Sequence, residues 1–249
     1  NCITLLLSKE RVRLVTEREW NSIGWLEEAR ALLGWLDSLD SGPVFLMIRH
    51  SERPEDIDVP TTIRVDLTKS GHDIAIEFGR RLPKKWRTTI YHSPHIRTTQ
   101  TAERVSEGLQ DAGGNLVDTE KLNVLLGGRG DIERIVTFAH DIGFNEFYWR
   151  WKRNELPAET IEPIDDYLKR LTQHITNRFS KADRNDLHIY VTHDIVIAAS
   201  RMVYLDLPTD EGLAVPFLGG YGIARSKQTL VGFKSGKPVE VVRNTLNRG

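Results

Sequence analysis

The chain has 249 residues, and its 34 Lys and Arg residues against 35 Asp and Glu residues leave a formal net charge of −1. Such a balance argues against a general polyanion-binding protein, so no nucleic-acid partner is expected. No apolar run approaches the roughly 18 residues that a membrane span needs, so no membrane partner is expected either. The length suits one large domain with its own core.

The chain carries a single cysteine, Cys2. One thiol cannot form a disulfide within the chain, so we expect a reducing, cytoplasmic location. The sequence opens on Asn1 without an initiator methionine, which suggests a trimmed chain. The apolar residues that follow are too few for a signal peptide, and no targeting segment is expected.

Hydrophobic periodicity predicts strands that alternate with helices. An amphipathic stripe marks a helix over 17–36, and the continuous apolar run after it marks a strand over 44–48 that is buried on both faces. This alternation indicates βα units and a largely parallel sheet. The other predicted elements are a helix over 68–82, a strand over 88–92 with a helix after it, a helix over 163–179, a strand over 187–192 with a helix after it, and edge strands or a hairpin at 221–224 and 238–242.

Residues 112–160 do not follow this pattern. They have mixed periodicity, several glycines and an aromatic, basic cluster at 147–153. We interpret them as an insertion that caps one edge of the sheet and sets substrate specificity. The whole chain, 1–249, is then a single α/β domain with an N-terminal helical extension over about 1–40 and this cap.

Polar side chains follow three of the predicted strands at the point where each strand ends. The sequence Arg-His-Ser-Glu-Arg at 49–53 follows the first strand, Arg97 comes shortly after the second, and His193 and Asp194 follow the third. In parallel sheets, ligands bind beyond the carboxyl ends of the strands. We therefore expect these side chains to share one site.

Such a site would bind a phosphoryl group. Guanidinium groups pair with phosphate oxygens in a bidentate manner and keep their charge. A neutral imidazole is a nucleophile toward phosphorus, and flanking arginines keep it neutral and stabilise the charge of the transition state. A carboxylic acid must then protonate the leaving oxygen, and Asp194 and Glu52 are the candidates.

No metal site and no cofactor are expected. His92 and His95 have the spacing of a loose metal pair, but no nearby cysteine or convergent carboxylate supports them as ligands.

The motifs resemble those of the histidine phosphatase superfamily, which includes the phosphoglycerate mutases and the histidine acid phosphatases. The resemblance runs from residue 44 to about residue 205. Its pieces are Arg49-His50-Ser51 for the family's Arg-His-Gly, Leu67-Thr68 with Gly71 and Gly79, the segment from Ser93 to Ala102, and Thr192-His193-Asp194.

The resemblance implies a phosphoglycerate mutase-like fold, a three-layer α/β/α sandwich around a mostly parallel sheet. It implies His50 as the phosphorylated nucleophile, with Arg49, Arg97 and His193 binding the phosphoryl group, and Arg53 is expected to join them. The implied activity is a metal-independent phosphatase that hydrolyses small phosphomonoesters through a phosphohistidine.

Two branches of the family differ in the acid they use. Arg53 and Asp194 match the acid-phosphatase branch, although Ser51 replaces its glycine. The mutase-like branch takes its acid from a glutamate, and Val124 stands at the corresponding position here. We therefore expect Asp194 as the proton donor, with Glu52 in reserve. A phosphoglycerate mutase-like phosphotransferase and a non-catalytic module that binds phosphorylated ligands stay open as alternatives, as does the oligomeric state.

Overall fold

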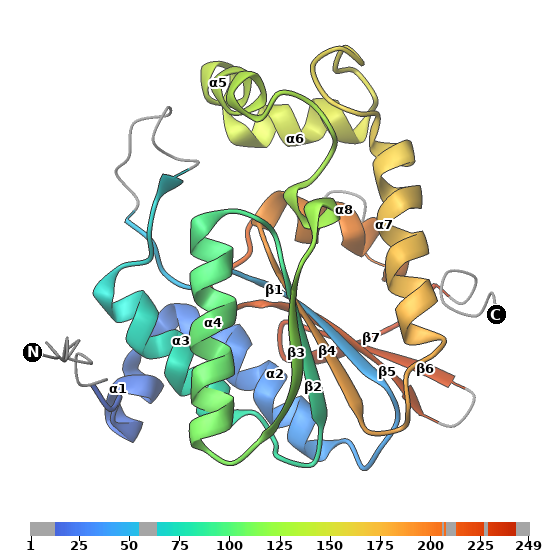
Figure 1. Cartoon of the computed structure of the whole chain (residues 1–249). Coiled ribbons are helices and arrows are strands. Elements are labelled where there is room, and N and C mark those ends of the chain that lie inside the picture. The colour runs from blue at the N-terminus through green and yellow to red at the C-terminus, as the bar shows by residue number, and fades with distance from the viewer. Residues whose placement is uncertain (1–12, 55–63, 206, 208–212, 227–228, 243–249) are drawn as a thin grey trace, which may run out of the picture.

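The structure is a computed structural model that describes residues 13–54, 64–205, 207, 213–226 and 229–242 (Figure 1). The prediction about Cys2 and the first part of the N-terminal extension lie outside the described residues. No helix in the described ranges has both the length and the apolar character needed to cross a membrane.

A mixed seven-stranded sheet forms the centre of the fold. Its strands are β1 (Val44–Arg49), β2 (Arg87–His92), β3 (Asn115–Lys121), β4 (Asp186–Thr192), β5 (Gly220–Ser226), β6 (Thr229–Lys234) and β7 (Lys237–Val239). Their order across the sheet is β3-β2-β4-β1-β5-β6-β7. The pairs among the first four strands are parallel, and β5, β6 and β7 add antiparallel pairs at the other edge. The predicted parallel arrangement thus holds for the half that carries the strand-end motifs.

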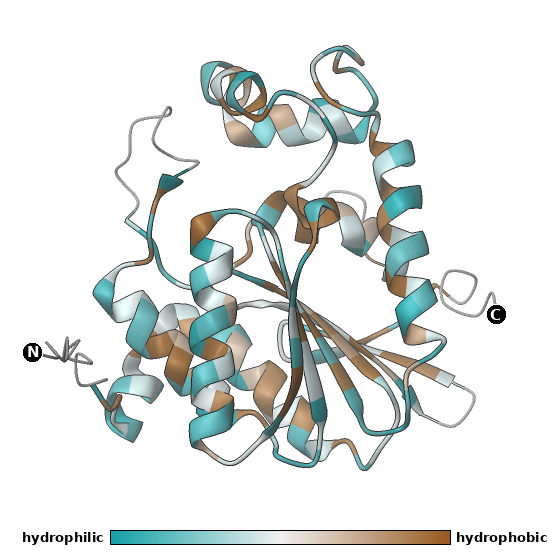
Figure 2. Ribbon diagram, viewed as in Figure 1, coloured by the Kyte–Doolittle hydropathy of each residue, from teal (hydrophilic) through white to brown (hydrophobic). Residues whose placement is uncertain are grey.

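Helices cover both faces of this sheet, as predicted. They are α1 (Glu17–Ser22), α2 (Glu27–Ser38), α3 (Lys69–Arg81), α4 (Ile96–Asp111), α5 (Ile132–Ile142), α6 (Phe144–Lys152), α7 (Ile164–Phe179) and α8 (Asp194–Tyr204), with 3₁₀ turns η1 (Gly24–Leu26) and η3 (Asn123–Leu126). Residues of β1 alternate between two cores: Leu46 packs with α2, α3 and α4, and Met47 packs with α7 and α8. Both faces of β1 therefore meet an apolar core. Figure 2 shows hydrophobic residues along the central strands of the sheet.

Helices α3 and α4 pack against each other at two glycines. A Cβ at Gly79 would lie 2.1 Å from the carbonyl oxygen of Val105, and one at Gly108 would lie 1.9 Å from that of Ile76. The missing side chains let the two backbones approach this closely in the C-terminal half of α4.

The helix predicted over 17–36 is interrupted in the structure. Ile23 adopts an extended conformation with φ −78° and ψ 110°, so the segment forms α1, η1 and α2 in place of one helix. Thr16 caps α1 in a capping box with Glu19, which gives the short helix its own start.

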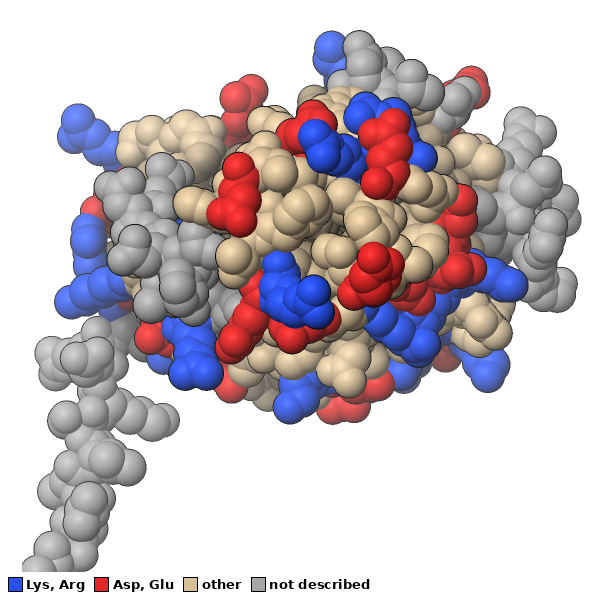
Figure 3. All heavy atoms as spheres, turned by 90° about the horizontal axis from the view of Figure 1, so that it is seen from above, with Lys and Arg blue, Asp and Glu red and all other residues tan. Residues whose placement is uncertain are grey.

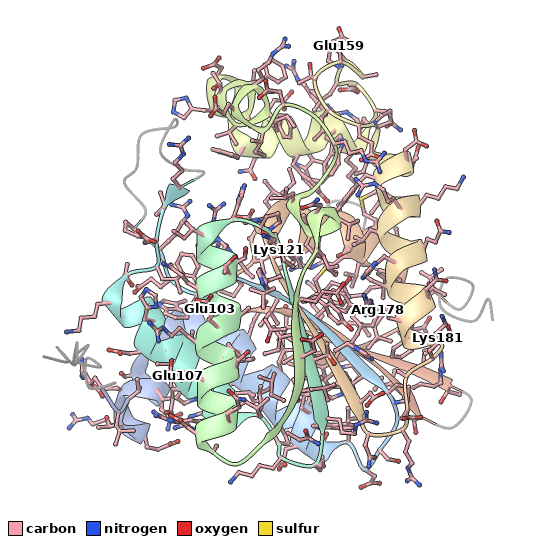
Figure 4. All side chains as sticks on the ribbon, in the orientation of Figure 1. Glu103, Glu107, Lys121, Glu159, Arg178 and Lys181 are labelled. Atoms are coloured by element: carbon pink, nitrogen blue, oxygen red, sulfur yellow. The ribbon has the colours of Figure 1, made fainter. Side chains whose placement is uncertain are left out.

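The stretch 112–160, predicted to be an insertion, includes strand β3 of the sheet. Strand β3 lies at the sheet edge and is half-exposed, so it lacks the apolar run of a central strand. Arg178 of α7 reaches this edge (Figure 4) and donates to both carboxylate oxygens of Glu120, at 2.9 and 2.8 Å. After β3, the chain continues into η3, α5 and α6, which lie above the upper ends of the strands (Figure 1). At the other edge, β6 was not predicted, and β7 covers only the start of 238–242.

Candidate active site

The three strand-end motifs meet because β2, β4 and β1 are neighbours in the sheet. The backbone N–H of His50 donates to Thr192 O at 3.0 Å, and that of Ser93 donates to Val191 O at 3.2 Å. These bonds align the residues after β1 and β2 with the last residues of β4. His50, Ser93 and His193 thus stand side by side at one edge of the sheet.

Arg97 in the first turn of α4 connects the two histidines. Its Nε donates to Nε2 of His50 at 3.1 Å, and its Nη2 donates to Nδ1 of His193 at 3.3 Å. The side chain is buried. Burial and the neighbouring charge of Arg53 lower the pKa of Arg97 to about 10, which still leaves the guanidinium charged near neutral pH.

The contacts of His50 set its tautomer. Its Nδ1 lies 2.7 Å from the carbonyl oxygen of Ser51, so Nδ1–H is the donor there. Nε2 therefore keeps its lone pair and accepts from Arg97. Burial, followed by the charges of Arg97 and Arg49, holds the pKa of His50 well below its usual range. The buried imidazole is neutral, with Nε2 directed at the guanidinium.

His193 is held in the opposite tautomer by a chain of hydroxyl groups. Because Nδ1 accepts from Arg97, Nε2–H donates to Ser93 Oγ at 2.9 Å. Ser93 Oγ in turn lies 2.7 Å from Thr98 Oγ1. Burial and the charge of Arg97 keep the pKa of His193 well below its usual range. The roles of Ser93 and Thr98 were not predicted; the only sequence signal was their presence in the motif around Arg97.

Arg49 is held from three sides. Its Nη1 donates to Val215 O at 2.7 Å, its Nη2 lies 3.3 Å from Oδ2 of Asp194, and its guanidinium carbon lies 4.5 Å from the ring centre of Phe217. Asp194 also accepts from the N–H of Ile195 at 2.9 Å, at the start of α8. Arg49 and Asp194 thus enter the site as an ion pair.

The two remaining predicted side chains lie in different surroundings. Arg53 donates to Pro54 O, and its charge contributes to the lowered pKa values of His50 and Arg97, so it lies close to both. Glu52 instead accepts from Thr68 Oγ1 at 2.6 Å, and Thr68 caps the N-terminus of α3. The Glu52 carboxylate is therefore engaged with α3.

Ser51 fits where the family carries glycine. Its side chain is fully buried, and its Oγ donates to Gly71 O at 2.8 Å. Its N–H donates to Thr101 Oγ1 at 2.9 Å. Ser51 is not among the described residues with a positive φ, so its backbone does not need the freedom of glycine.

His92 and His95 face different surroundings. His92 lines a groove of about 490 Å³ together with residues of α4 and β3, among them Glu103 and Glu107 on α4 (Figure 4). The His95 ring packs on His193 with ring centres 4.8 Å apart. Within the described ranges, no group of three His, Cys, Asp or Glu side chains is placed to hold a metal ion.

The positive charge of the site lies inside the protein. Arg97 is 7% exposed, and the Arg49 side chain is 18% exposed. On the face seen from above in Figure 3, acidic and basic side chains are interspersed. The near-zero net charge therefore coexists with a local group of arginines, of which Arg97 is buried and Arg49 and Arg53 are partly buried.

Comparison with known proteins identifies the family. The sequence profile of the histidine phosphatase superfamily (branch 1) matches residues 45–227. No curated protein matches the chain. Phosphoglycerate mutase from Bacillus anthracis is 17% identical, with a TM-score of 0.52 over 83% of this chain and 95% of that one. Bacillus stearothermophilus YhfR is 21% identical, with a TM-score of 0.55 over 81% and 96%.

A third similar structure, a mycobacterial glucosyl-3-phosphoglycerate phosphatase, is 17% identical, with a TM-score of 0.51 over 80% of this chain and 97% of that one. At such identities the three structures establish the phosphoglycerate mutase-like fold alone. The profile match runs from β1 past His193 to the end of β5, so it includes all three strand-end motifs. The chain belongs to branch 1 of the histidine phosphatase superfamily.

Proposed function

We propose that the protein is a phosphatase that hydrolyses small phosphomonoesters through a phosphohistidine on His50. The observation that supports this most directly is the state of the His50 imidazole. Its proton is on Nδ1, where Ser51 O accepts it, so the lone pair of Nε2 faces the guanidinium of Arg97 at 3.1 Å. A neutral, oriented imidazole beside a fixed cation is the arrangement that attack on phosphorus requires.

In the first step, Arg97 turns its Nε–H from Nε2 of His50 to the phosphoryl group, and the freed lone pair of Nε2 forms a bond to phosphorus as the bond from phosphorus to the ester oxygen breaks. Arg97 and Arg49 pair with the non-bridging oxygens, and Arg53 adds to the same anion site, while His193 orients Arg97 by accepting from its Nη2. These arginines supply the positive charge that stabilises the transferring group, without a metal ion. The proton on Nδ1 stays on His50, where Ser51 O stabilises the cationic phosphohistidine.

Asp194 is the proposed proton donor to the leaving oxygen. Its carboxylate lies 3.3 Å from Arg49, and a bound phosphoryl group would compete for that guanidinium and free the carboxylate. The carboxylate then takes the proton of the monoanionic phosphate ester and passes it to the leaving oxygen as the ester bond breaks. In the second step, Asp194 takes a proton from water, the water oxygen bonds to phosphorus, and the N–P bond breaks to give inorganic phosphate. Glu52 is less suitable because Thr68 already binds it.

Val124 supports this choice of acid. The resemblance aligns it with the glutamate of mutase-like relatives, but here it is an apolar side chain buried in the core beside α7. Tyr167 OH donates to its carbonyl oxygen at 3.2 Å, which keeps the residue in place. No proton can come from this position, so the acid must come from another element.

Substrate choice is proposed to rest with the chain between β3 and α7. Its η3 turn is tied to the sheet because Thr192 Oγ1 donates to Leu125 O at 2.6 Å, one residue before His193. Helices α5 and α6 extend from this turn above the strand ends (Figure 1). A side chain that contacts the substrate beyond its phosphoryl group would come from here.

Hydrolysis of a generic aryl phosphate in the presence of EDTA tests the proposal. The wild type should hydrolyse the aryl phosphate equally fast with and without EDTA, and His50→Ala should lose this hydrolytic activity. His140→Ala, at an exposed histidine of α5, is the matched control and should keep it. A fully active His50→Ala protein would refute the mechanism. Mixing phosphorylated enzyme with candidate acceptors separates hydrolysis from transfer, since hydrolysis yields inorganic phosphate only.

A further inference from the structure

A short segment before β5 closes over the end of β1. The N–H of Leu218 donates to Arg49 O at 3.1 Å, and the N–H of Arg49 donates to Gly219 O at 2.9 Å. Leu218 itself has φ 56° and a fully buried side chain. This segment, residues 215–219, is therefore anchored to the Arg49 backbone at its C-terminal end, and the Arg49 side chain binds its other end at Val215 O.

The ring of Phe217 contacts both neighbouring site residues. The guanidinium carbon of Arg49 lies 4.5 Å from its centre, and the His50 ring lies 5.7 Å away at an interplanar angle of 43°. Phe217 is only 8% exposed. A cation over a shielded aromatic face is held more strongly than one in water. The ring thus restricts Arg49, a side chain with many rotamers, to one position.

The N-terminal helical segment supports this ring. Trp25 of η1 meets Phe217 edge-to-face, with centres 5.6 Å apart and an interplanar angle of 84°. In α2, Glu28 accepts from the N–H of Gly220 at 3.1 Å and from Ser235 Oγ at 2.8 Å. The N-terminal helical segment therefore contacts the Phe217 ring through Trp25 and the backbone of Gly220 through Glu28.

We propose that Phe217 is a positioning residue that fixes the Arg49 guanidinium and the His50 ring, and that Trp25 of the N-terminal helical segment supports it. The inference rests on the proposed function in one respect, since it takes Arg49 and His50 to form the phosphoryl site. It assigns a role to η1 and α2, which precede the first motif of the family.

Removing the ring should affect the transition state more than substrate binding. Without Phe217, the partners of the Arg49 guanidinium within the described ranges are Val215 O and the partly exposed Asp194. Phe217→Leu should lower kcat roughly 10-fold with a smaller change in KM, since a precisely placed arginine stabilises charge that develops during the reaction. Phe217→Tyr keeps the ring and should restore most of the activity. Trp25→Leu should lower kcat a few-fold, and the double variant should be no worse than Phe217→Leu alone.

Phe233→Leu is the matched control. Phe233 is also 8% exposed and stacks on Trp35 of α2 with centres 5.2 Å apart, but it lies in β6. The same substitution there should lower stability without changing kcat. Two further readouts do not need turnover: calorimetric binding of vanadate and the imidazole titration of His50 followed by NMR. In Phe217→Leu, vanadate affinity should fall roughly 10-fold and the pKa of His50 should rise, because Arg49 is one of the cations that lower it.

The outcomes separate this inference from the proposed function. If the wild type binds vanadate without hydrolysing esters, the phosphatase proposal fails, yet a selective loss of vanadate affinity in Phe217→Leu still supports the positioning role. If the wild type is active and Phe217→Leu matches Phe233→Leu in kcat, vanadate affinity and the His50 titration, the positioning role is wrong. A wild type that binds no vanadate would overturn both proposals.

Discussion

Nε of Arg97 lies 3.1 Å from Nε2 of His50, two side chains 47 positions apart in the sequence. Since the guanidinium can only donate, the imidazole nitrogen must accept, and the histidine is neutral as long as this contact holds. The cation and the nucleophile are thus positioned by each other. Several measurable consequences come from this pair and from its neighbours.

Replacing Arg97 should be one of the most damaging changes to activity. Arg97→Ala removes the group that contacts both histidines, and we expect kcat/KM to fall about 10²- to 10³-fold, the range for loss of one preorganised donor. Arg97→Lys should recover only part of the lost kcat/KM, because a lysine ammonium cannot donate in the bidentate geometry of a guanidinium. Arg80→Ala is the control: Arg80 pairs with Asp111 on the surface between α3 and α4, and its loss should leave kcat/KM unchanged.

The same variant should shift the titration of His50. Burial lowers the pKa of His50, and the charge of Arg97 is the next largest cause. Removing that charge makes the imidazolium easier to form, so the pKa of His50 should rise in Arg97→Ala. NMR titration of the ring protons measures this directly. An unchanged or lower pKa would show that Arg97 does not interact with His50 in solution.

The role of Asp194 can be tested through the leaving group. A general acid matters most when the leaving oxygen is a poor leaving group, and it contributes about 10²- to 10⁴-fold. Asp194→Asn should therefore slow hydrolysis of an alkyl phosphate by about that factor and that of a nitrophenyl phosphate much less. Glu52→Gln, at a carboxylate bound by Thr68, should show no such dependence on the leaving group. If Glu52→Gln shows it and Asp194→Asn does not, the assignment of the acid is reversed.

His95 should make the protein less stable in acid. Burial and the charge of Arg97 lower the pKa of His95 from 6.5 to about 4. Between these values the unfolded chain binds a proton that the folded protein does not, so the free energy of unfolding falls as the pH falls, at about 1.4 kcal/mol per pH unit for one such group. His95→Asn should make the stability curve between pH 6 and pH 5 shallower by up to that slope. His140→Asn, at an exposed site, should leave the slope of the stability curve unchanged. Equal curves for the two variants would contradict the assignment of this pH dependence to His95.

Two glycine-to-alanine substitutions should have opposite effects on stability. At Gly108 a Cβ would lie 1.9 Å from the backbone oxygen of Ile76, so Gly108→Ala must separate α3 from α4 and should cost about 1–3 kcal/mol or more. Gly34 lies inside α2 with nothing within 4 Å of its Cβ position. Gly34→Ala should stabilise by about 0.5–1 kcal/mol because alanine favours the helix. Chemical denaturation measures both, and a stable Gly108→Ala protein would show that the helices are not in direct contact.

The sequence patterns indicated the strand-end motifs and a largely parallel sheet, and the resemblance to the family implied the three-layer fold. A central strand such as β1 is apolar on both faces, so it ends visibly where the chain turns polar at Arg49 and His50. Each motif is local in the chain, and the helices between the strands predict that the strands run parallel. Parallel strands place their carboxyl ends at the same edge of the sheet, which was enough to expect Arg97 and His193 near His50.

The edge elements and the partners of each side chain depended on the tertiary structure. Strand β3 is half-exposed, so its residues carry no periodic signal, and only pairing with β2 makes it a strand. Arg49 is charged in any fold, but its contacts with Val215 O and Phe217 join positions more than 160 residues apart. Short-range patterns record which residues are apolar or charged. Which charged side chain contacts which aromatic ring is decided only when distant segments of the chain pack together.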